Sequence, residues 1–118
     1  PALINKIKNI EGRKLKLKNY NNIRDISTID YVTQQITNLI FKKFNGIVNC
    51  GSGNGISLEN LAKKIAYDKF KKNIELDKRF KLKKPSKIIC NNYKLLKITG
   101  IKKMDNLFKI LWKKRQLS

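Results

Sequence analysis

The stretch from Gly46 to Ala66 constrains the fold more than any other part of the chain. A β-branched apolar run, Gly46 to Cys50, leads into three closely spaced glycines, and Ser57 then precedes apolar residues that recur with the period of one helix face. This order predicts a buried strand, a tight turn and a helix capped by Ser57. A single strand followed by a helix indicates a mixed α/β chain.

The glycine-rich turn has two interpretations. A helix N-terminus attracts anions, so the loop is a candidate phosphate site. However, the glycines stand at 51, 53 and 55, and Ile56 occupies the position of the third glycine in G-x-G-x-x-G. No Gly-Lys-Ser/Thr follows either. A structural turn with a helix cap is therefore the favoured interpretation.

Apolar spacing and turn residues predict the remaining elements. The helix that contains Val32 to Ile40 begins with Thr28 or Asp30 as its cap. The others are a helix over 2–10, a half-exposed strand over 14–18, a short strand over 73–76, a lysine-rich loop over 78–87, a helix over 93–97 that stops at Gly100, and a last helix from Met104 to Trp112.

Length and composition exclude several classes of protein. With 118 residues, the chain has room for one domain, and no apolar run approaches the roughly 20 residues that cross a membrane. Two cysteines are too few for a disulfide scaffold and favour the reducing cytoplasm. Because histidine is absent, we expect neither a zinc site nor the commonest general base.

The formal net charge of +20 suggests nucleic acid as a partner. The chain has 24 Lys but only 4 Arg, together with 17 Ile and 14 Asn, and all three abundant residues have A/T-rich codons. Proteins that read bases favour Arg, whose planar fork makes bidentate contacts. We therefore expect nucleic acid to bind only non-specifically through charge. A small lysine-rich nucleic-acid-binding module is the alternative function.

Three segments in order resemble the C-terminal part of extended short-chain dehydrogenases/reductases, the NAD-dependent epimerase/dehydratase family that acts on sugar nucleotides. They are "IRDISTIDYV", "GIVNCGSGNGISLENLAKKIA" and "PSKIICNNYKLLKITGIKK". The resemblance implies an α/β fold comprising the last strand of a Rossmann-like sheet and a small substrate-binding lobe, spanning 1–118. In this family the cofactor loop lies elsewhere, near the N-terminus, so "CGSGNGIS" would be structural.

The same resemblance implies a function. The chain would be the substrate-binding portion of an NAD(P)-dependent sugar-nucleotide epimerase, dehydratase or reductase, and not catalytic alone. Its partners would be the nucleotide-sugar substrate and the N-terminal cofactor domain of one parent chain, and a homodimer is compatible with this. NAD or NADP would bind the parent enzyme, and no cofactor is expected on this chain alone. The first residue is Pro1, so we expect a processed terminus or a piece of a longer protein.

No catalytic residue is predicted in this chain. The family's Tyr-x-x-x-Lys pair lies before the matched region, and we interpret the spacings Tyr67…Lys71 and Tyr93…Lys97 as chance matches.

The resemblance does imply candidate residues for binding substrate. Arg24 matches an arginine that contacts the nucleotide diphosphate in several members, and a guanidinium can hold two phosphate oxygens at once. The alternative is a surface ion pair between Arg24 and Asp25. A second basic residue of the family corresponds to Lys81, with Arg79 as its substitute.

Overall fold

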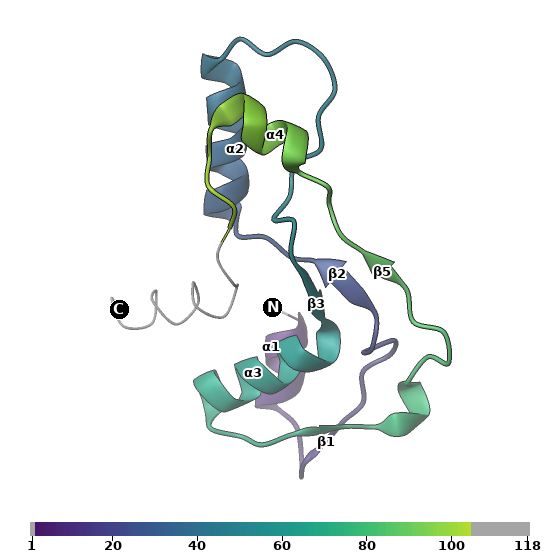
Figure 1. Ribbon diagram of the computed structural model, residues 1–118. Coiled ribbons are helices and arrows are strands. Elements are labelled where there is room, and N and C mark those ends of the chain that lie inside the picture. Colours follow the sequence, from purple (N-terminus) through teal and green to yellow (C-terminus); the bar gives the residue numbers. More distant parts are fainter. Residues whose placement is uncertain (1, 105–118) are drawn as a thin grey trace. The chain divides into compact units, whose positions relative to one another are not determined.

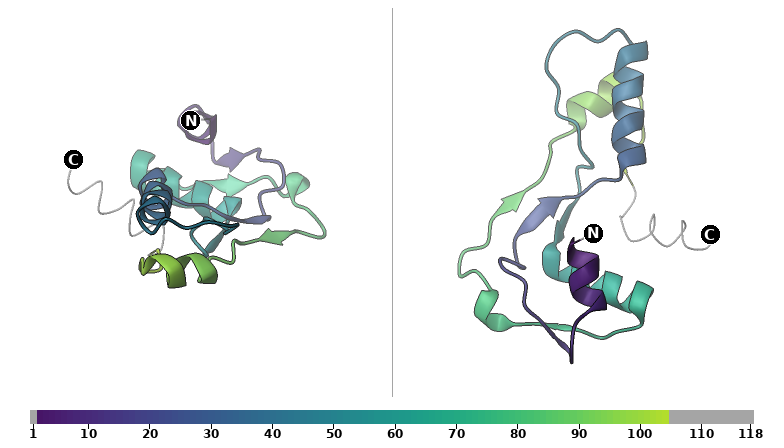
Figure 2. Two further views of the ribbon diagram at one scale, coloured as in Figure 1. Left: turned by 90° about the horizontal axis from the view of Figure 1, so that it is seen from above. Right: turned by 180° about the vertical axis from the view of Figure 1, so that it is seen from behind.

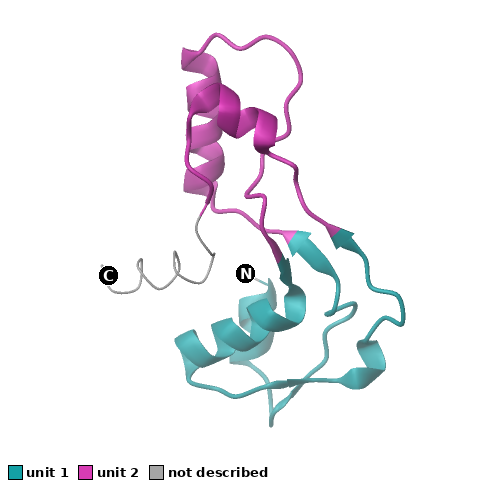
Figure 3. Ribbon diagram, in the orientation of Figure 1, with its two compact units in different colours: residues 1–24, 56–87 teal, residues 25–55, 88–118 magenta. Residues whose placement is uncertain are grey.

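The computed structural model describes residues 2–104 (Figure 1). The described chain forms two compact units (Figure 3), of which unit 1 consists of 2–24 and 56–87 and unit 2 of 25–55 and 88–104. Strands β2 (Ile23–Asp25), β3 (Gly55–Ser57) and β5 (Lys87–Ile88) pair in the order β3-β2-β5, and the chain passes from one unit to the other within each of them. The mixture of helices and short strands confirms the α/β class. Beyond Met104, the predicted last helix lies outside the described residues.

Unit 1 contains two helices and a small parallel sheet. Its elements are α1 (Ala2–Lys8), β1 (Lys14–Leu15), α3 (Leu58–Phe70), β4 (Glu75–Leu76) and the 3-10 helix η1 (Lys78–Phe80). The strands β1 and β4 are parallel, with Lys14 opposite Glu75. Helix α1 packs against α3 (Figure 2). The core of this unit consists of Ile7, Leu15, Tyr20, Ala62, Ala66, Ile74 and Leu76.

Helix α3 begins as predicted, with Ser57 as its N-terminal cap. The hydroxyl of Ser57 accepts the backbone N–H of Asn60 at 3.1 Å, which satisfies one of the amide groups left unpaired at the first turn. On the inner face of the helix, Ala62 and Ala66 are fully buried. Their small side chains leave room for Ile7 of α1, which is also fully buried in the same core.

Unit 2 is built on two helices, α2 (Ile29–Phe41) and α4 (Tyr93–Thr99), which pack against each other. Thr28 caps α2, because its hydroxyl accepts the backbone N–H of Tyr31 at 3.2 Å, which decides between the two predicted caps. Helix α4 ends at Gly100, whose φ of +70° is favourable only for glycine, as expected.

The prediction of a buried strand over Gly46 to Cys50 is wrong for this chain. The segment has no regular secondary structure, and Ile47 is 88% exposed. A β-branched run forms a strand only when a neighbouring strand accepts its hydrogen bonds. No strand of the described residues pairs with this segment.

Candidate functional site

The carboxylate of Asp25 organises the glycine-rich loop of unit 2. It accepts the backbone N–H of Ser52 at 3.0 Å, the hydroxyl of Ser52 at 2.5 Å and the backbone N–H of Gly53 at 2.9 Å. From the segment after β5, the backbone N–H of Cys90 also donates to it at 3.1 Å. One carboxylate therefore joins segments that are 27 and 65 residues away in sequence.

These contacts keep Asp25 ionised. Partial burial would raise the pKa of this carboxyl, but the hydrogen bonds to its charged form outweigh burial and lower the pKa below its ordinary value. The Cys90 thiol beside it responds in the opposite sense. Burial and the nearby charge of Asp25 raise the pKa of the Cys90 thiol, which favours its protonated form.

Gly51 lies where only a glycine fits. A Cβ at this position would lie 2.6 Å from the Cβ of Cys90 and 2.9 Å from its sulfur. The carbonyl of Gly51 accepts two side-chain amides, from Gln35 at 2.7 Å and from Asn92 at 3.0 Å. The close approach of the two segments and the paired amides fix the loop against α2 and the start of α4.

The contacts of the glycine-rich loop argue against a phosphate site. The N–H groups of Ser52 and Gly53, which a phosphate would need, already donate to Asp25. An ionised carboxylate at this position repels an anion. The loop is therefore a structural turn, as its glycine spacing indicated.

Arg24 and Asp25 are neighbours in β2, but they do not pair. Successive side chains of a strand point to opposite faces, and Asp25 turns to the glycine loop. Arg24 instead donates to Ser86, through Nη1 to the carbonyl oxygen at 3.2 Å and through Nη2 to the hydroxyl at 2.9 Å, and to the carbonyl of Ile23 at 2.9 Å. In the described residues no carboxylate forms a salt bridge with Arg24. Its positive charge is thus positioned by neutral groups and left uncompensated.

Arg79 has a carboxylate partner. Its Nε and Nη2 bind both oxygens of Asp77 at 2.6–3.1 Å. Hydrogen bonds and the charge of Arg79 lower the pKa of Asp77 to about 2. Because this fork is already occupied, Arg79 is a weaker phosphate candidate than Arg24.

Lys81 directly follows η1 and is exposed. All three candidate cations lie in unit 1, but no described hydrogen bond or salt bridge joins Arg24 to Arg79 or Lys81. What links their segments is a pair of asparagines in the turn before β2. Asn21 exchanges two hydrogen bonds with the backbone of Leu82, and Asn22 accepts the backbone N–H of Ser86 at 2.9 Å.

The two Tyr-x-x-x-Lys spacings do not form proton-transfer pairs. The Lys71 ammonium lies over the ring of Tyr67, 5.5 Å from its centroid, and Tyr93 is largely exposed. Neither lysine has a hydrogen bond to the tyrosine hydroxyl among the described residues.

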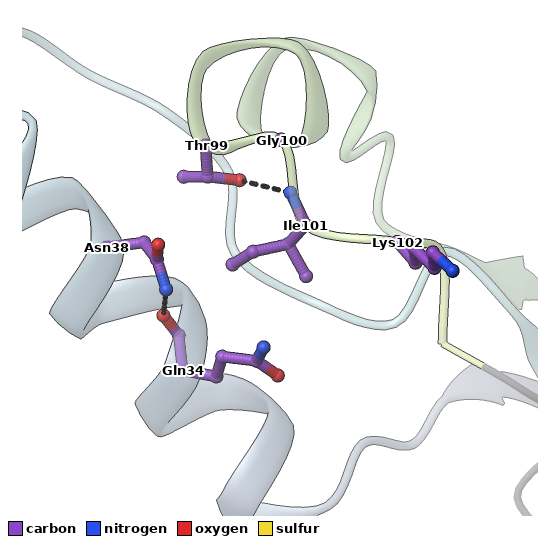
Figure 4. Close-up of a pocket in the computed structure, with 6 residues that line it drawn as sticks. All are labelled: Gln34, Asn38, Thr99, Gly100, Ile101 and Lys102. Atoms are coloured by element: carbon purple, nitrogen blue, oxygen red, sulfur yellow. Dashed lines mark hydrogen bonds between the residues drawn. The ribbon is translucent and has the colours of Figure 1, made fainter.

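An open pocket of about 370 Å³ lies between α2 and the end of α4 in unit 2 (Figure 4). It is lined by Gln34, Asn38, Thr99, Gly100, Ile101 and Lys102. The Asn38 amide donates to the Gln34 carbonyl at 2.8 Å, and the backbone N–H of Ile101 donates to the Thr99 hydroxyl at 3.3 Å (Figure 4). The lining offers the amides of Gln34 and Asn38, the cation of Lys102 and the hydroxyl of Thr99, which donates to the Leu95 carbonyl at 2.8 Å. None of the sequence-predicted site residues lies in it.

Residues 2–104 contain no group of three or more His, Cys, Asp or Glu side chains placed to hold a metal ion. Their helices are too short or too polar to cross a membrane.

Sequence reasoning did not identify the roles of Asp25, Gln35 and Asn92. The available signal was the alternation of β2, which places Arg24 and Asp25 on opposite faces. That alternation does not reveal the partner of Asp25, because the partner lies on a distant loop. Gln35 is fully buried in α2, and its Oε1 lacks a hydrogen-bond partner in the described chain.

The fold is similar to that of a solved structure, RMD from Pseudomonas aeruginosa complexed with NADPH. The match has a TM-score of 0.71 and 15% sequence identity, and it covers 97% of this chain but only 40% of the RMD chain. The chain thus shares the fold of less than half of a protein that was solved with NADPH. No protein-family model and no curated protein matches the sequence.

Proposed function

We propose that this chain is the substrate-binding region of an NAD(P)-dependent enzyme that acts on nucleotide sugars, an extended short-chain dehydrogenase/reductase. The observation that carries the proposal is the fold shared with part of the NADPH-complexed RMD chain. The order of the sequence motifs supports it independently. The remaining part of such an enzyme would supply the nicotinamide, which carries the hydride, and the proton-transfer pair.

Within this account Arg24 holds the diphosphate of the substrate. Ser86 fixes the guanidinium through two contacts, which reduces the side-chain entropy lost on binding. The absence of a carboxylate partner in the described residues leaves the charge available to phosphate oxygens. Lys81 adds a second, more flexible cation. Arg79 is a weaker candidate, because its guanidinium is already bound to the carboxylate of Asp77.

The exposed segment over Gly46 to Cys50 fits the same proposal. Its sequence is typical of a strand buried on both faces, as in parallel sheets. In the complete enzyme it would pair with the sheet of the cofactor domain, and Ile47 would be buried there. The segment is unpaired here because the described chain offers no neighbouring strand.

The test begins with the reading frame that encodes this chain. We expect it to encode a G-x-x-G-x-x-G loop and a Tyr-x-x-x-Lys pair. The complete protein should convert at least one member of a panel of UDP-, GDP- and dTDP-sugars in the presence of NAD(P)(H), with products identified by mass spectrometry. The 118-residue chain alone should show no conversion. Hydride transfer by the isolated chain, or a frame that encodes no cofactor-binding region, would overturn the proposal.

A further inference from the structure

Two lysine-rich segments that are distant in sequence run side by side in unit 1. They cover 13–21 and 75–84, and the strands within them are parallel. Backbone and asparagine hydrogen bonds join them along their length: Glu75 N to Arg13 O at 2.7 Å, Asp77 N to Leu15 O at 2.9 Å, Asn19 N to Phe80 O at 3.1 Å, and Asn21 with Leu82 at 2.9 and 3.0 Å.

Side chains alternate along the first segment. Leu15 is buried in the core and Leu17 packs against it, whereas Lys14, Lys16 and Lys18 are exposed. This is the period of a strand with one face on a core.

The second segment contacts the same core, although it contains a 3-10 helix and does not alternate as a strand does. Phe80 packs against it, and Lys81, Lys83 and Lys84 are exposed. Both segments therefore contact one core and carry exposed lysines beside each other in the same unit. The six lysines form what we call the lysine ribbon: Lys14, Lys16, Lys18, Lys81, Lys83 and Lys84.

Carboxylates do little to neutralise the ribbon. The two segments contain only Glu75 and Asp77, and Asp77 is largely buried and bound to Arg79. Lys14 lies near enough to contribute to the lowered pKa of Asp77. None of the six lysines forms a salt bridge within the described part of the chain. The ribbon is therefore a local concentration of positive charge.

We propose that the lysine ribbon binds the phosphate backbone of single-stranded nucleic acid without reading its sequence. The exposed ammonium groups of two segments that run side by side supply several cations to the phosphates of a flexible strand. Lysine ammonium groups contact phosphates as point charges, whereas recognition of bases relies on the planar forks of arginine. The lysine ribbon shares only Lys81 with the proposed diphosphate site, and the variants below leave Lys81 in place, so that the two proposals can fail separately.

The experiment compares two variants of the 118-residue chain that have equal net charge. The ribbon variant combines Lys16→Gln, Lys18→Gln, Lys83→Gln and Lys84→Gln. The control replaces four exposed lysines outside the ribbon, at positions 6, 42, 69 and 97, by glutamine. Each set lowers the formal charge of +20 by the same amount. Binding of a fluorescein-labelled 20-nucleotide oligothymidylate is followed by anisotropy at several KCl concentrations, and far-UV circular dichroism checks the fold.

At about 0.1 M KCl, the ribbon variant should lose at least about tenfold in affinity and the control less than about threefold. The slope of log K against log[KCl] should become shallower by about 0.7 for each contact removed. A mixed-sequence oligonucleotide should bind as tightly as oligothymidylate. A milder variant with only Lys16→Gln and Lys83→Gln should lower log K by about half as much as the full ribbon variant. Equal losses in ribbon and control variants, or no measurable binding by the parent chain, would overturn the proposal.

Discussion

Asp25 accepts two hydrogen bonds from one residue, Ser52, through its backbone N–H and its hydroxyl. Ser52 is fully buried, and its hydroxyl in turn accepts the backbone N–H of Asn54 at 3.0 Å. The negative charge of Asp25 is thus matched by donors that the glycine-rich loop would otherwise present to solvent. The same relationship makes the loop rigid and closes it to an anion.

Replacement of Asp25 by asparagine should destabilise the chain. The amide keeps the size of the side chain but loses the charge that strengthens four hydrogen bonds, so we expect the free energy of unfolding to fall by about 2 kcal/mol. Urea unfolding followed by far-UV circular dichroism measures this. Glu59→Gln removes one charge from the exposed pair with Lys63 and should change the free energy of unfolding by less than about 0.5 kcal/mol. Equal losses for both variants would refute a special role for Asp25.

Gly51→Ala should also be destabilising, because the new methyl group would overlap the Cβ and sulfur of Cys90. Overpacking of this kind costs about 1–3 kcal/mol. Removal of the obstructing side chain should relieve it, so Gly51→Ala is expected to cost much less when Cys90→Gly is already present. Urea unfolding of the two single variants and the double variant gives the coupling energy. If the losses of the two single variants add up in the double variant, Gly51→Ala does not destabilise the chain through overlap with Cys90.

The stability of the chain should fall in acid between about pH 4 and pH 2. The folded pKa of Asp77, about 2, lies below its ordinary value of 3.8, so the ionised carboxylate stabilises the fold above that ordinary value. This stabilisation disappears as the pH falls through the folded pKa. The lowered pKa of Asp25 acts in the same direction. Thermal midpoints measured from pH 6 to pH 2 should fall less steeply for Asp77→Asn than for the parent, and parallel curves would contradict this.

The exposed segment around Ile47 should promote self-association of the isolated chain. An unpaired β-branched segment can accept a strand from another molecule, and a charge placed there opposes such pairing. Ile47→Lys should therefore shift sedimentation-velocity profiles toward the monomer, with a change in unfolding free energy below about 0.5 kcal/mol. Ile29→Lys introduces the same charge at a comparably exposed position of α2 and should leave the profiles unchanged. If the parent chain is monomeric at all concentrations, the exposed segment around Ile47 does not promote self-association.

Sequence reasoning succeeded where structure depends on near neighbours. The caps of α2 and α3 and the glycine that ends α4 involve residues within four positions of each other, so the pattern contains the necessary information. Strand formation needs a distant partner. The run over Gly46 to Cys50 has the composition of a strand, but composition cannot supply the neighbour that would pair with it.

The same limit applies to the candidate site. Arg24 was identified from a resemblance, yet the residue that positions it, Ser86, is 62 residues away. From the sequence, Asp25 is expected only as an ion-pair partner of its neighbour Arg24. In a strand, however, successive side chains point to opposite faces, which separates the two. Contacts over such separations follow from the assembled fold and not from local spacing.

The most direct test compares two affinities in the longer enzyme of which we propose this chain is a part. Isothermal titration should show that Arg24→Gln weakens the binding of a nucleotide diphosphate, UDP or GDP, by about 10- to 100-fold, the loss expected for charge-assisted hydrogen bonds. Binding of NAD(P)H should stay within about twofold, because we propose that the nicotinamide site lies outside this region. If nucleotide-diphosphate affinity is unchanged, or the complete protein binds neither ligand, this chain is not the substrate-binding region of such an enzyme.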